Sequence, residues 1–284
     1  MAQPYDPARF REFEHAGWER VGAGYDDSFG LVTRQSAGPL LDVVGLPAAG
    51  ARAGMRLLDI ACGPGYVTAA AAARGAFAVG LDFAASVVSA AQRRHTQAAP
   101  GSIEFRQGDA EALLFPDASF DAVVCSFGVP HFPHPERALA EAFRVLKRGG
   151  RYALTDWTPA IPASLNGLFL AAVQRHGDPH VPVPQGPPRG QFADPPFCAR
   201  LFAGAGFAPP HLQALDLVLT GTPPEGVTDI ILRGMVRTRG VFELQTPQAQ
   251  AAIRADIAAA ALAYVRDGEA RLPCPATLVW AEKR

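Results

Sequence analysis

The alternation of short apolar runs with helical patterns between residues 55 and 157 constrains the fold most strongly. Five runs, at 55–61, 76–82, 102–108, 120–126 and 151–157, have the length and character of buried strands. Helices are predicted in the gaps, over Tyr66 to Arg74, Ala84 to Thr96 and Pro135 to Leu146. Continuous apolar strands that alternate with helices indicate a parallel sheet covered on both faces. We therefore predict an α/β, doubly wound architecture.

Other elements flank this core. Two helices are predicted before it, over Pro7 to Val21 and Ser28 to Val44. After it the pattern is less regular, and the stretch GDPHVPVPQGPPRG is predicted to be a loop because its prolines can neither continue a helix nor donate ladder hydrogen bonds. The remaining predicted elements are helices over Ala163 to His176, Pro196 to Ala205, Glu225 to Arg239 and Pro247 to Val265, and strands over His211 to Leu219 and Ala276 to Trp280.

Charge and composition limit the classes of function. The formal net charge of −1 gives no broad attraction to nucleic acid. The start of the chain lacks the apolar stretch of a signal peptide, and no run reaches the ~18 apolar residues of a membrane span, so we expect a cytoplasmic protein without a membrane contact. The four cysteines form no C-x-x-C pair, which favours reduced thiols over a disulfide framework or a zinc knuckle.

The stretch LLDIACGPGYVT, Leu57 to Thr68, forms the turn between the first predicted strand and its helix. In an open parallel sheet, ligands bind beyond the carboxyl ends of the strands at such turns. Gly63 and Gly65 lack a Cβ and let the backbone approach a ligand closely. Asp82, at the end of the second strand, is placed to accept hydrogen bonds from two ribose hydroxyls, which indicates a nucleoside-containing ligand.

Two details distinguish between nucleoside ligands. A dinucleotide fingerprint that starts at Gly63 requires a third glycine where the chain has Thr68. Asp59 precedes the glycines, where a pyrophosphate would be repelled and an ammonium group attracted. A ribose on one side and a cation on the other describe S-adenosylmethionine.

The sequence D-x-A-x-G-x-G, from Asp59 to Gly65, resembles motif I of the class I S-adenosylmethionine-dependent methyltransferases. GLDFAAS, QGDAEALLFPDASFDAVVCSF and ERALAEAFRVLKRGGRYALTDW resemble the later motifs of that family in the same order. Within that family, the sequence most resembles the small-molecule group that includes the ubiquinone and menaquinone C-methyltransferases. The resemblance implies a Rossmann-like, seven-stranded sheet.

The resemblance also implies roles for residues of this chain. Gly65 belongs to the cofactor turn, and Asp59 with the backbone of Ala61 and Gly63 would hold the methionine portion. Ala61 stands where the family usually has glycine, and alanine preserves the close approach unless a positive φ is required. Asp82 would bind the ribose hydroxyls.

The rest of the cofactor is assigned in the same way. Phe83 would lie against the adenine, Asp109 would accept its amino group, and the Ala110 amide would face the ring. Ser126 and Phe127 would line the floor near the sulfonium. Tyr25 matches an aromatic residue that closes over the cofactor, or it packs a helix against the core.

Transfer of a methyl group requires positioning and exclusion of water more than covalent help. If the acceptor is a phenol or an activated carbon, a histidine could remove its proton. His131, in GVPHFPHPERAL, resembles a histidine near the family's active site and is the catalytic candidate, although it could instead hold its loop by a hydrogen bond. Trp157 and His176 are predicted to line the acceptor pocket, or to lie in a surface loop without contact. No metal site is predicted, because HGDPH supplies too few converging ligands.

The stretch RGMVRTRG, at Arg233 to Gly240, could bind an acidic group, but a solvated helix face is favoured. We predict an S-adenosylmethionine-dependent methyltransferase that acts on oxygen or carbon of a small, apolar or aromatic acceptor. The alternatives are a non-catalytic cofactor-binding module, a small-molecule N-methyltransferase and, against the charge balance, a nucleic-acid methyltransferase. A monomer or homodimer is expected. The predicted units are N-terminal helices that close the cofactor site (1–50), the cofactor-binding core (51–157), a cap over the acceptor pocket (158–196) and a C-terminal completion of the sheet with a helical insertion (197–284).

Overall fold

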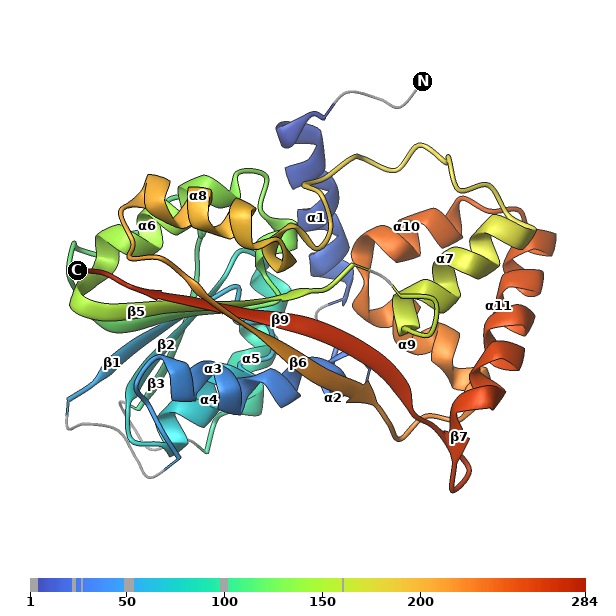
Figure 1. Ribbon diagram of the computed structural model, residues 1–284. Coiled ribbons are helices and arrows are strands. Elements are labelled where there is room, and N and C mark those ends of the chain that lie inside the picture. Colours follow the sequence, from blue (N-terminus) through green and yellow to red (C-terminus); the bar gives the residue numbers. More distant parts are fainter. Residues whose placement is uncertain (1–4, 22–23, 27, 49–53, 98–101, 160) are drawn as a thin grey trace.

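A seven-stranded sheet organises the molecule, in the order β3-β2-β1-β4-β5-β9-β6 (Figure 1). The computed structural model describes residues 5–21, 24–26, 28–48, 54–97, 102–159 and 161–284. The strands are β1 Arg56–Ile60, β2 Phe77–Asp82, β3 Ile103–Gln107, β4 Phe120–Ser126, β5 Leu146–Trp157, β6 His211–Leu219 and β9 Leu272–Glu282. The first five are parallel, and β9 runs antiparallel to both β5 and β6. The predicted doubly wound, seven-stranded fold is confirmed.

Both faces of the sheet are covered. Leu57 and Leu58, neighbours on β1, are fully buried in two different hydrophobic clusters, one on each face. Helices α3 (Ala37–Val43) and α4 (Tyr66–Ala73) contribute to the first cluster, and helices α6 (Pro135–Val145) and α8 (Pro195–Ala205) contribute to the second. Figure 1 shows these two pairs on opposite sides of the sheet, with α5 (Ala85–Arg94) beside β2 and β3. This burial on both faces explains why the central strands read as uninterrupted apolar runs.

The N-terminal segment differs in part from the prediction. Helix α1 covers Pro7–Val21, as predicted, but the second predicted helix is divided into α2 (Gly30–Thr33), a 3₁₀ turn (Arg34–Ser36) and α3. Thr33 and Ser36 explain the division, because their hydroxyls donate to the carbonyls of Phe29 and Thr33 and compete with regular helical pairing. The predicted boundary between residues 50 and 51 lies outside the described residues.

A group of helices lies beside the sheet, at the end opposite the N-terminus of β1 (Figure 1). It contains α7 (Leu165–His176), α9 (Val227–Gly234), α10 (Val236–Glu243) and α11 (Pro247–Ala261). The single helix predicted over Glu225 to Arg239 is wrong, because Met235 is extended between α9 and α10. A Cβ on Gly234 would lie 2.1 Å from the Cβ of Phe29, so this break depends on a close tertiary contact that a glycine permits.

The C-terminal part also differs from the prediction. The predicted helix Pro247 to Val265 ends at Ala261, and a short hairpin follows, with β7 Val265–Arg266 and β8 Glu269–Ala270. Its turn is Asp267-Gly268, both with positive φ, which is the typical residue pair of a two-residue hairpin loop. The loop over residues 177–190 contains no helix or strand, as predicted. Within the described ranges, every helix is too short or too polar to cross a membrane.

Candidate active site

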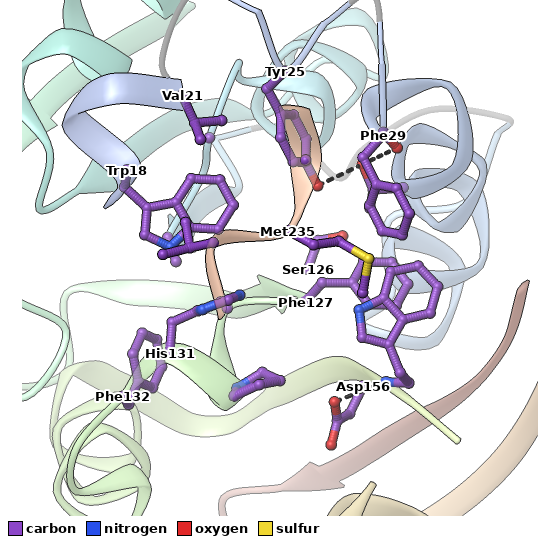
Figure 2. A pocket seen from close by; sticks show the side chains of 18 of the residues that line it. Trp18, Val21, Tyr25, Phe29, Ser126, Phe127, His131, Phe132, Asp156 and Met235 are labelled. Carbon is purple, nitrogen blue, oxygen red and sulfur yellow. Dashed lines mark hydrogen bonds between the residues drawn. The ribbon is translucent and has the colours of Figure 1, made fainter. Parts of the chain in front are cut away.

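One large pocket opens at the carboxyl ends of β1, β2, β4 and β5. Figure 2 shows Trp18, Val21, Tyr25 and Phe29 on one side of it and the segment after β4 on the other, with Met235 between them. The pocket wall therefore combines the sheet edge with α1, the segment after α1 and the junction of α9 and α10. Most of the wall is apolar, and the polar groups gather at a few points.

The turn after β1 forms the wall at the cofactor end predicted from the sequence. Ala61 and Gly63 line the pocket with φ of 55° and 54°. The backbone at Ala61 therefore does require a positive φ, which is the case in which alanine is a poorer substitute for the family's usual glycine. This left-handed conformation costs a non-glycine residue about 1–2 kcal/mol. A Cβ on Gly63 would have no protein atom within 4 Å, so the space beside this glycine is open for a ligand.

Gly65 has a different role from Gly63. It precedes α4 with a φ of 82°, and a Cβ there would lie 2.6 Å from the Phe105 ring. It is not among the residues that line the pocket. Its lack of a side chain thus allows the turn to pack on β3, and the prediction that Gly65 contacts the cofactor is not supported by its position.

Asp82 stands at the pocket at the end of β2. Its Oδ2 accepts the N–H of Gly63 at 3.0 Å, and its Oδ1 accepts the N–H of Ala84 at 3.1 Å. Burial raises the pKa of Asp82, while these backbone donors act in the opposite direction. The two N–H groups fix the carboxylate, and each oxygen keeps a lone pair that can accept a ribose hydroxyl.

Asp59 lies behind the glycine turn and does not line the pocket. Its Oδ2 accepts from the Thr68 backbone N–H and hydroxyl, at 3.0 and 2.7 Å. Its Oδ1 is buried without a hydrogen-bond partner. Burial raises the pKa of Asp59 to about 7. A buried carboxylate oxygen with no partner is costly, and nearby positive charge would relieve that cost.

The residues predicted to hold an adenine lie together. Phe83, Asp109 and Ala110 all line the pocket. Asp109 is already engaged, because it forms an ion pair with Arg11 of α1 and its Oδ1 accepts the N–H of Glu111 at 2.9 Å. Sequence reasoning missed Arg11, whose other guanidinium nitrogen lies 2.8 Å from Glu111. Helix α1 is thereby tied to the loop after β3.

Aromatic side chains form the middle of the pocket. Phe127, with a φ of 58°, stacks on Trp157 at a centroid distance of 4.0 Å, and Phe29 meets the edge of Trp157 at 5.2 Å. Tyr25 lines the same space and donates its hydroxyl to Thr33 at 3.3 Å. Ser126, the other predicted floor residue, also lines the pocket and lies 2.9 Å from the hydroxyl of Ser36 on the 3₁₀ turn. The structure thus brings four predicted residues, Tyr25, Ser126, Phe127 and Trp157, to one cavity. Figure 2 labels the first three of them.

His131 lies in a 3₁₀ turn after β4 and lines the pocket. Its Nδ1 is 2.8 Å from Oε2 of Glu14, which also accepts the indole N–H of Trp18 at 3.1 Å. The Trp18 ring meets the imidazole edge-on at 5.0 Å. Glu14 is fully buried, and its Oε1 has no hydrogen-bond partner. The sequence analysis missed Glu14 and Trp18, although a glutamate on the buried stripe of α1, with Phe10 and Val21, was a signal that could have found them.

The prediction for His176 is wrong. Its Nε2 lies 3.2 Å from Asp256 on α11, and His176 does not line the pocket. Only Ser164, Leu165 and Asn166, at the start of α7, reach the wall, while His176 ends this helix of 12 residues. A helix of that length spans about 18 Å, so its last turn is carried away from the site.

Charged residues that the sequence analysis did not place in the site also line the pocket: Asp156, Arg189 and Arg237. Asp156 is the second-last residue of β5, next to Trp157, and burial raises its pKa to about 7. Arg189 comes from the proline-rich loop. Arg237 belongs to the RGMVRTRG stretch, so the favoured interpretation of that stretch as a solvated face is wrong for this residue. Among the residues that the structure describes, no group of three histidine, cysteine, aspartate or glutamate side chains could hold a metal ion.

Comparisons with known proteins find similarity over part of the chain and to the whole fold. Residues 58–154 match the profile of a methyltransferase domain. This segment is therefore similar to a methyltransferase domain, as the motifs predicted, and the sheet has the class I fold, whose methyl donor is S-adenosylmethionine. The match covers the turn after β1, the adenine segment and the strands up to β5.

Individual relatives are similar over part of the chain. Demethylmenaquinone methyltransferase of Clavibacter sepedonicus is 42% identical over 124 residues, which cover 43% of this chain and 50% of that protein. A probable methyltransferase of Aspergillus luteorubrus, ltbC, is 34% identical over 166 residues, with coverage of 53% and 56%. The chain thus spans about half the length of these curated relatives. The crystal structure of the YcgJ protein from Bacillus subtilis is similar in fold, with a TM-score of 0.55, 23% identity and coverage of 88% and 98%.

Proposed function

We propose that this protein is an S-adenosylmethionine-dependent methyltransferase that acts on oxygen or carbon of a small, apolar or aromatic acceptor. One observation carries the proposal most directly. The glycine turn and Asp82, which suit a nucleoside cofactor, share a single pocket with an aromatic-walled space that contains His131. A cofactor site and an acceptor site must be continuous for a direct transfer, and this pocket provides that continuity.

The cofactor would lie along the carboxyl edge of the sheet. Asp82 would accept the ribose hydroxyls, with its carboxylate fixed by two backbone N–H groups. The open space beside Gly63 would admit the methionine portion, and the charge of that portion would offset the burial of Asp59. Phe83 and Ala110 would bound the adenine. The residues present therefore fit the cofactor.

The cofactor, when bound, supplies an activated methyl group on a sulfonium centre. The chain must then orient the acceptor and exclude water. Phe127, Trp157 and Phe29 form an apolar wall for a flat molecule, since each contacts the next through its ring. A wall of this kind also lowers the local dielectric, which favours displacement at a cationic centre.

His131 is the proposed general base. Glu14 accepts a hydrogen bond from Nδ1, so the proton sits on Nδ1 and the lone pair of Nε2 is left to take a proton from the acceptor. The described residues offer no hydrogen-bond partner to Nε2. Glu14 acts through the imidazole and is a positioning residue. Trp18, which lies on α1 with Glu14, donates to the Glu14 carboxylate and packs against the His131 imidazole, so it holds both side chains in place.

The curated relative from Clavibacter sepedonicus is named for demethylmenaquinone, an aromatic acceptor, which supports the aromatic class. We also propose the division of labour expected from the sequence, with α1 closing the cofactor end and residues 158–196 covering the acceptor. The ion pair of Arg11 with Asp109 supports the first part, and the place of Arg189 in the wall supports the second. We further propose that the acceptor is a small molecule and not a nucleic acid, which the net charge of −1 supports. The proposed location is the cytoplasm, and the proposed state is a monomer or a homodimer.

Isothermal titration with S-adenosylhomocysteine tests the cofactor site. We expect micromolar or tighter binding by the wild type and a loss of at least about tenfold, or ~1.4 kcal/mol, in Asp82→Ala. Asp216→Ala, on the exposed face of β6, is the matched control and should bind as the wild type does. Circular dichroism shows whether each variant is folded. A folded wild type that does not bind S-adenosylhomocysteine would overturn the proposed function.

A further inference from the structure

Two arginines line the pocket and have no ion-pair partner among the residues that the structure describes. Arg189 comes from the proline-rich loop and Arg237 from α10. The contacts that the two side chains do make are weak: the Arg189 guanidinium lies 3.4 Å from the Asn166 side chain, and the Arg237 guanidinium lies 5.8 Å from the Phe10 ring centroid. A guanidinium that lines a pocket without an ion-pair partner presents a fork of N–H donors to an incoming anion.

The nearby carboxylates do not supply that pairing. Oε2 of Glu14 is used by His131 and Trp18. Asp156 accepts the backbone N–H of Trp157 at 2.7 Å, and its raised pKa, about 7, keeps it partly protonated at neutral pH. Both carboxylates act on Arg189 only through space, and the two arginines repel each other.

Burial lowers the pKa of Arg189 to about 10 and also lowers the pKa of Arg237. Both side chains nevertheless remain cationic at neutral pH. The Arg189 side chain is still exposed to solvent and the Arg237 side chain is half-buried, and both line the pocket. The positive charge is therefore available to a molecule that enters the pocket, next to the aromatic wall of Phe127 and Trp157.

We propose that Arg189 and Arg237 form an anion-binding subsite, and that the acceptor is a flat apolar molecule bearing an anionic oxygen group, a carboxylate or an ionised enolate or phenolate. This inference rests on the proposed function and names the substrate class of the same site. A guanidinium presents a planar fork of N–H donors that matches two oxygens, so two of them fix both the charge and the orientation of such a group. The aromatic wall then places the rest of the ring system. Binding of the anion also provides an ion-pair partner for both arginines.

The test uses the intact protein saturated with S-adenosylhomocysteine, titrated with three probes. Naphthoate presents a carboxylate, hydroxynaphthoquinone presents an enolate that is ionised at neutral pH, and methyl naphthoate is the neutral isostere. We expect at least one anion to bind at least tenfold more tightly than the ester. Tighter binding of naphthoate would indicate a carboxylate on the acceptor, and tighter binding of hydroxynaphthoquinone would indicate an enolate or phenolate.

Variants assign the preference to the arginines. Arg189→Met and Arg237→Met should each lose at least tenfold in affinity for the preferred anion, with the affinities for S-adenosylhomocysteine and for the ester unchanged. Arg189→Lys keeps the charge without the fork and should fall between the wild type and Arg189→Met. Arg233→Met is the matched control, because Arg233 is exposed on α9 and lies outside the pocket wall. Thermal unfolding shows which variants are folded.

Three results would overturn the inference: equal affinity for anion and ester, anion affinity that survives in folded methionine variants, or failure of both anions to bind the loaded wild type at millimolar concentration. Each of these results counts against the inference only if the same protein sample still binds S-adenosylhomocysteine. Loss of S-adenosylhomocysteine binding by the wild type counts against the proposed function instead, so the two failures are distinguishable.

Discussion

The buried Asp59 gives a pH-dependent stability that a single substitution should reveal. Its pKa is raised from 3.8 to about 7 because burial disfavours the charged form. Between these two values the folded state binds one more proton than the unfolded state. Stability therefore decreases as the pH rises through this window, and the contribution is constant above it. The shift corresponds to a penalty on the order of 4 kcal/mol at pH 8.

Asp59→Asn removes this penalty and keeps the shape. The asparagine oxygen can still accept both hydrogen bonds from Thr68, but its NH₂ group occupies the place of Oδ1, which has no partner. An unsatisfied buried donor costs roughly 1–3 kcal/mol, so the net gain at pH 8 is about 1–3 kcal/mol. Near pH 5, where Asp59 is protonated in the folded state, the variant should be no more stable than the wild type.

Urea unfolding at intervals from pH 5 to pH 8, without cofactor, measures both curves. Between pH 5 and pH 7 the wild type should lose about 2 kcal/mol more than Asp59→Asn, and the slope should flatten above pH 7. Asp216→Asn, exposed on β6, should follow the wild type. A variant whose stability runs parallel to that of the wild type at every pH would refute the reasoning, because Asp59 would then titrate alike in the folded and unfolded chains.

Two further predictions concern the turn and the base. Gly63→Ala should weaken S-adenosylhomocysteine binding at least about threefold with a stability loss of ~1–2 kcal/mol from the positive φ, whereas Gly65→Ala should lose more stability because its Cβ would press on a ring of β3. Titration and thermal unfolding separate the two, and equal binding by wild type and Gly63→Ala would contradict the open space assigned to a ligand. Glu14→Gln should lower kcat about tenfold or more and move the acidic limb of the pH-rate profile, with S-adenosylhomocysteine affinity unchanged, because it alters the partner of His131 and touches no cofactor residue. A tenfold rise in KM with unchanged kcat and an unmoved profile would assign Glu14 a structural role only.

The sheet core was predictable because its strands are buried on both faces and are therefore recorded in the sequence as continuous apolar runs. Strand β6 has the predicted bounds, and the central strands agree within a few residues. Errors arose where a long-range contact decided the local structure. The break at Met235 depends on Gly234 meeting Phe29, which no local pattern records. The hairpin at Asp267-Gly268 was different, because its turn signal was present in the sequence and was outweighed by the helical pattern before it.

The candidate site divides in the same way. The residues at the cofactor end follow consecutive strands, so chain order and sheet geometry together indicate that they meet. The acceptor end is assembled from α1, the proline-rich loop and α10, and only their packing brings Glu14, Arg189 and Arg237 to one cavity. His176 was assigned to that cavity because it follows β5 in sequence, but α7 carries it away.

The wall of the pocket is built from two parts of the chain, the segment 58–154 and the residues outside it. The glycine turn and Asp82, which suit the cofactor, fall within 58–154, the segment that matches a methyltransferase domain, while Trp157, Arg189 and Arg237 lie outside it. Under the proposed function, substrate choice would therefore be separable from binding of the methyl donor. A chimaera that exchanges the segment of α9 and α10 alone would replace one face of the acceptor chamber and leave the donor face with its original chemistry.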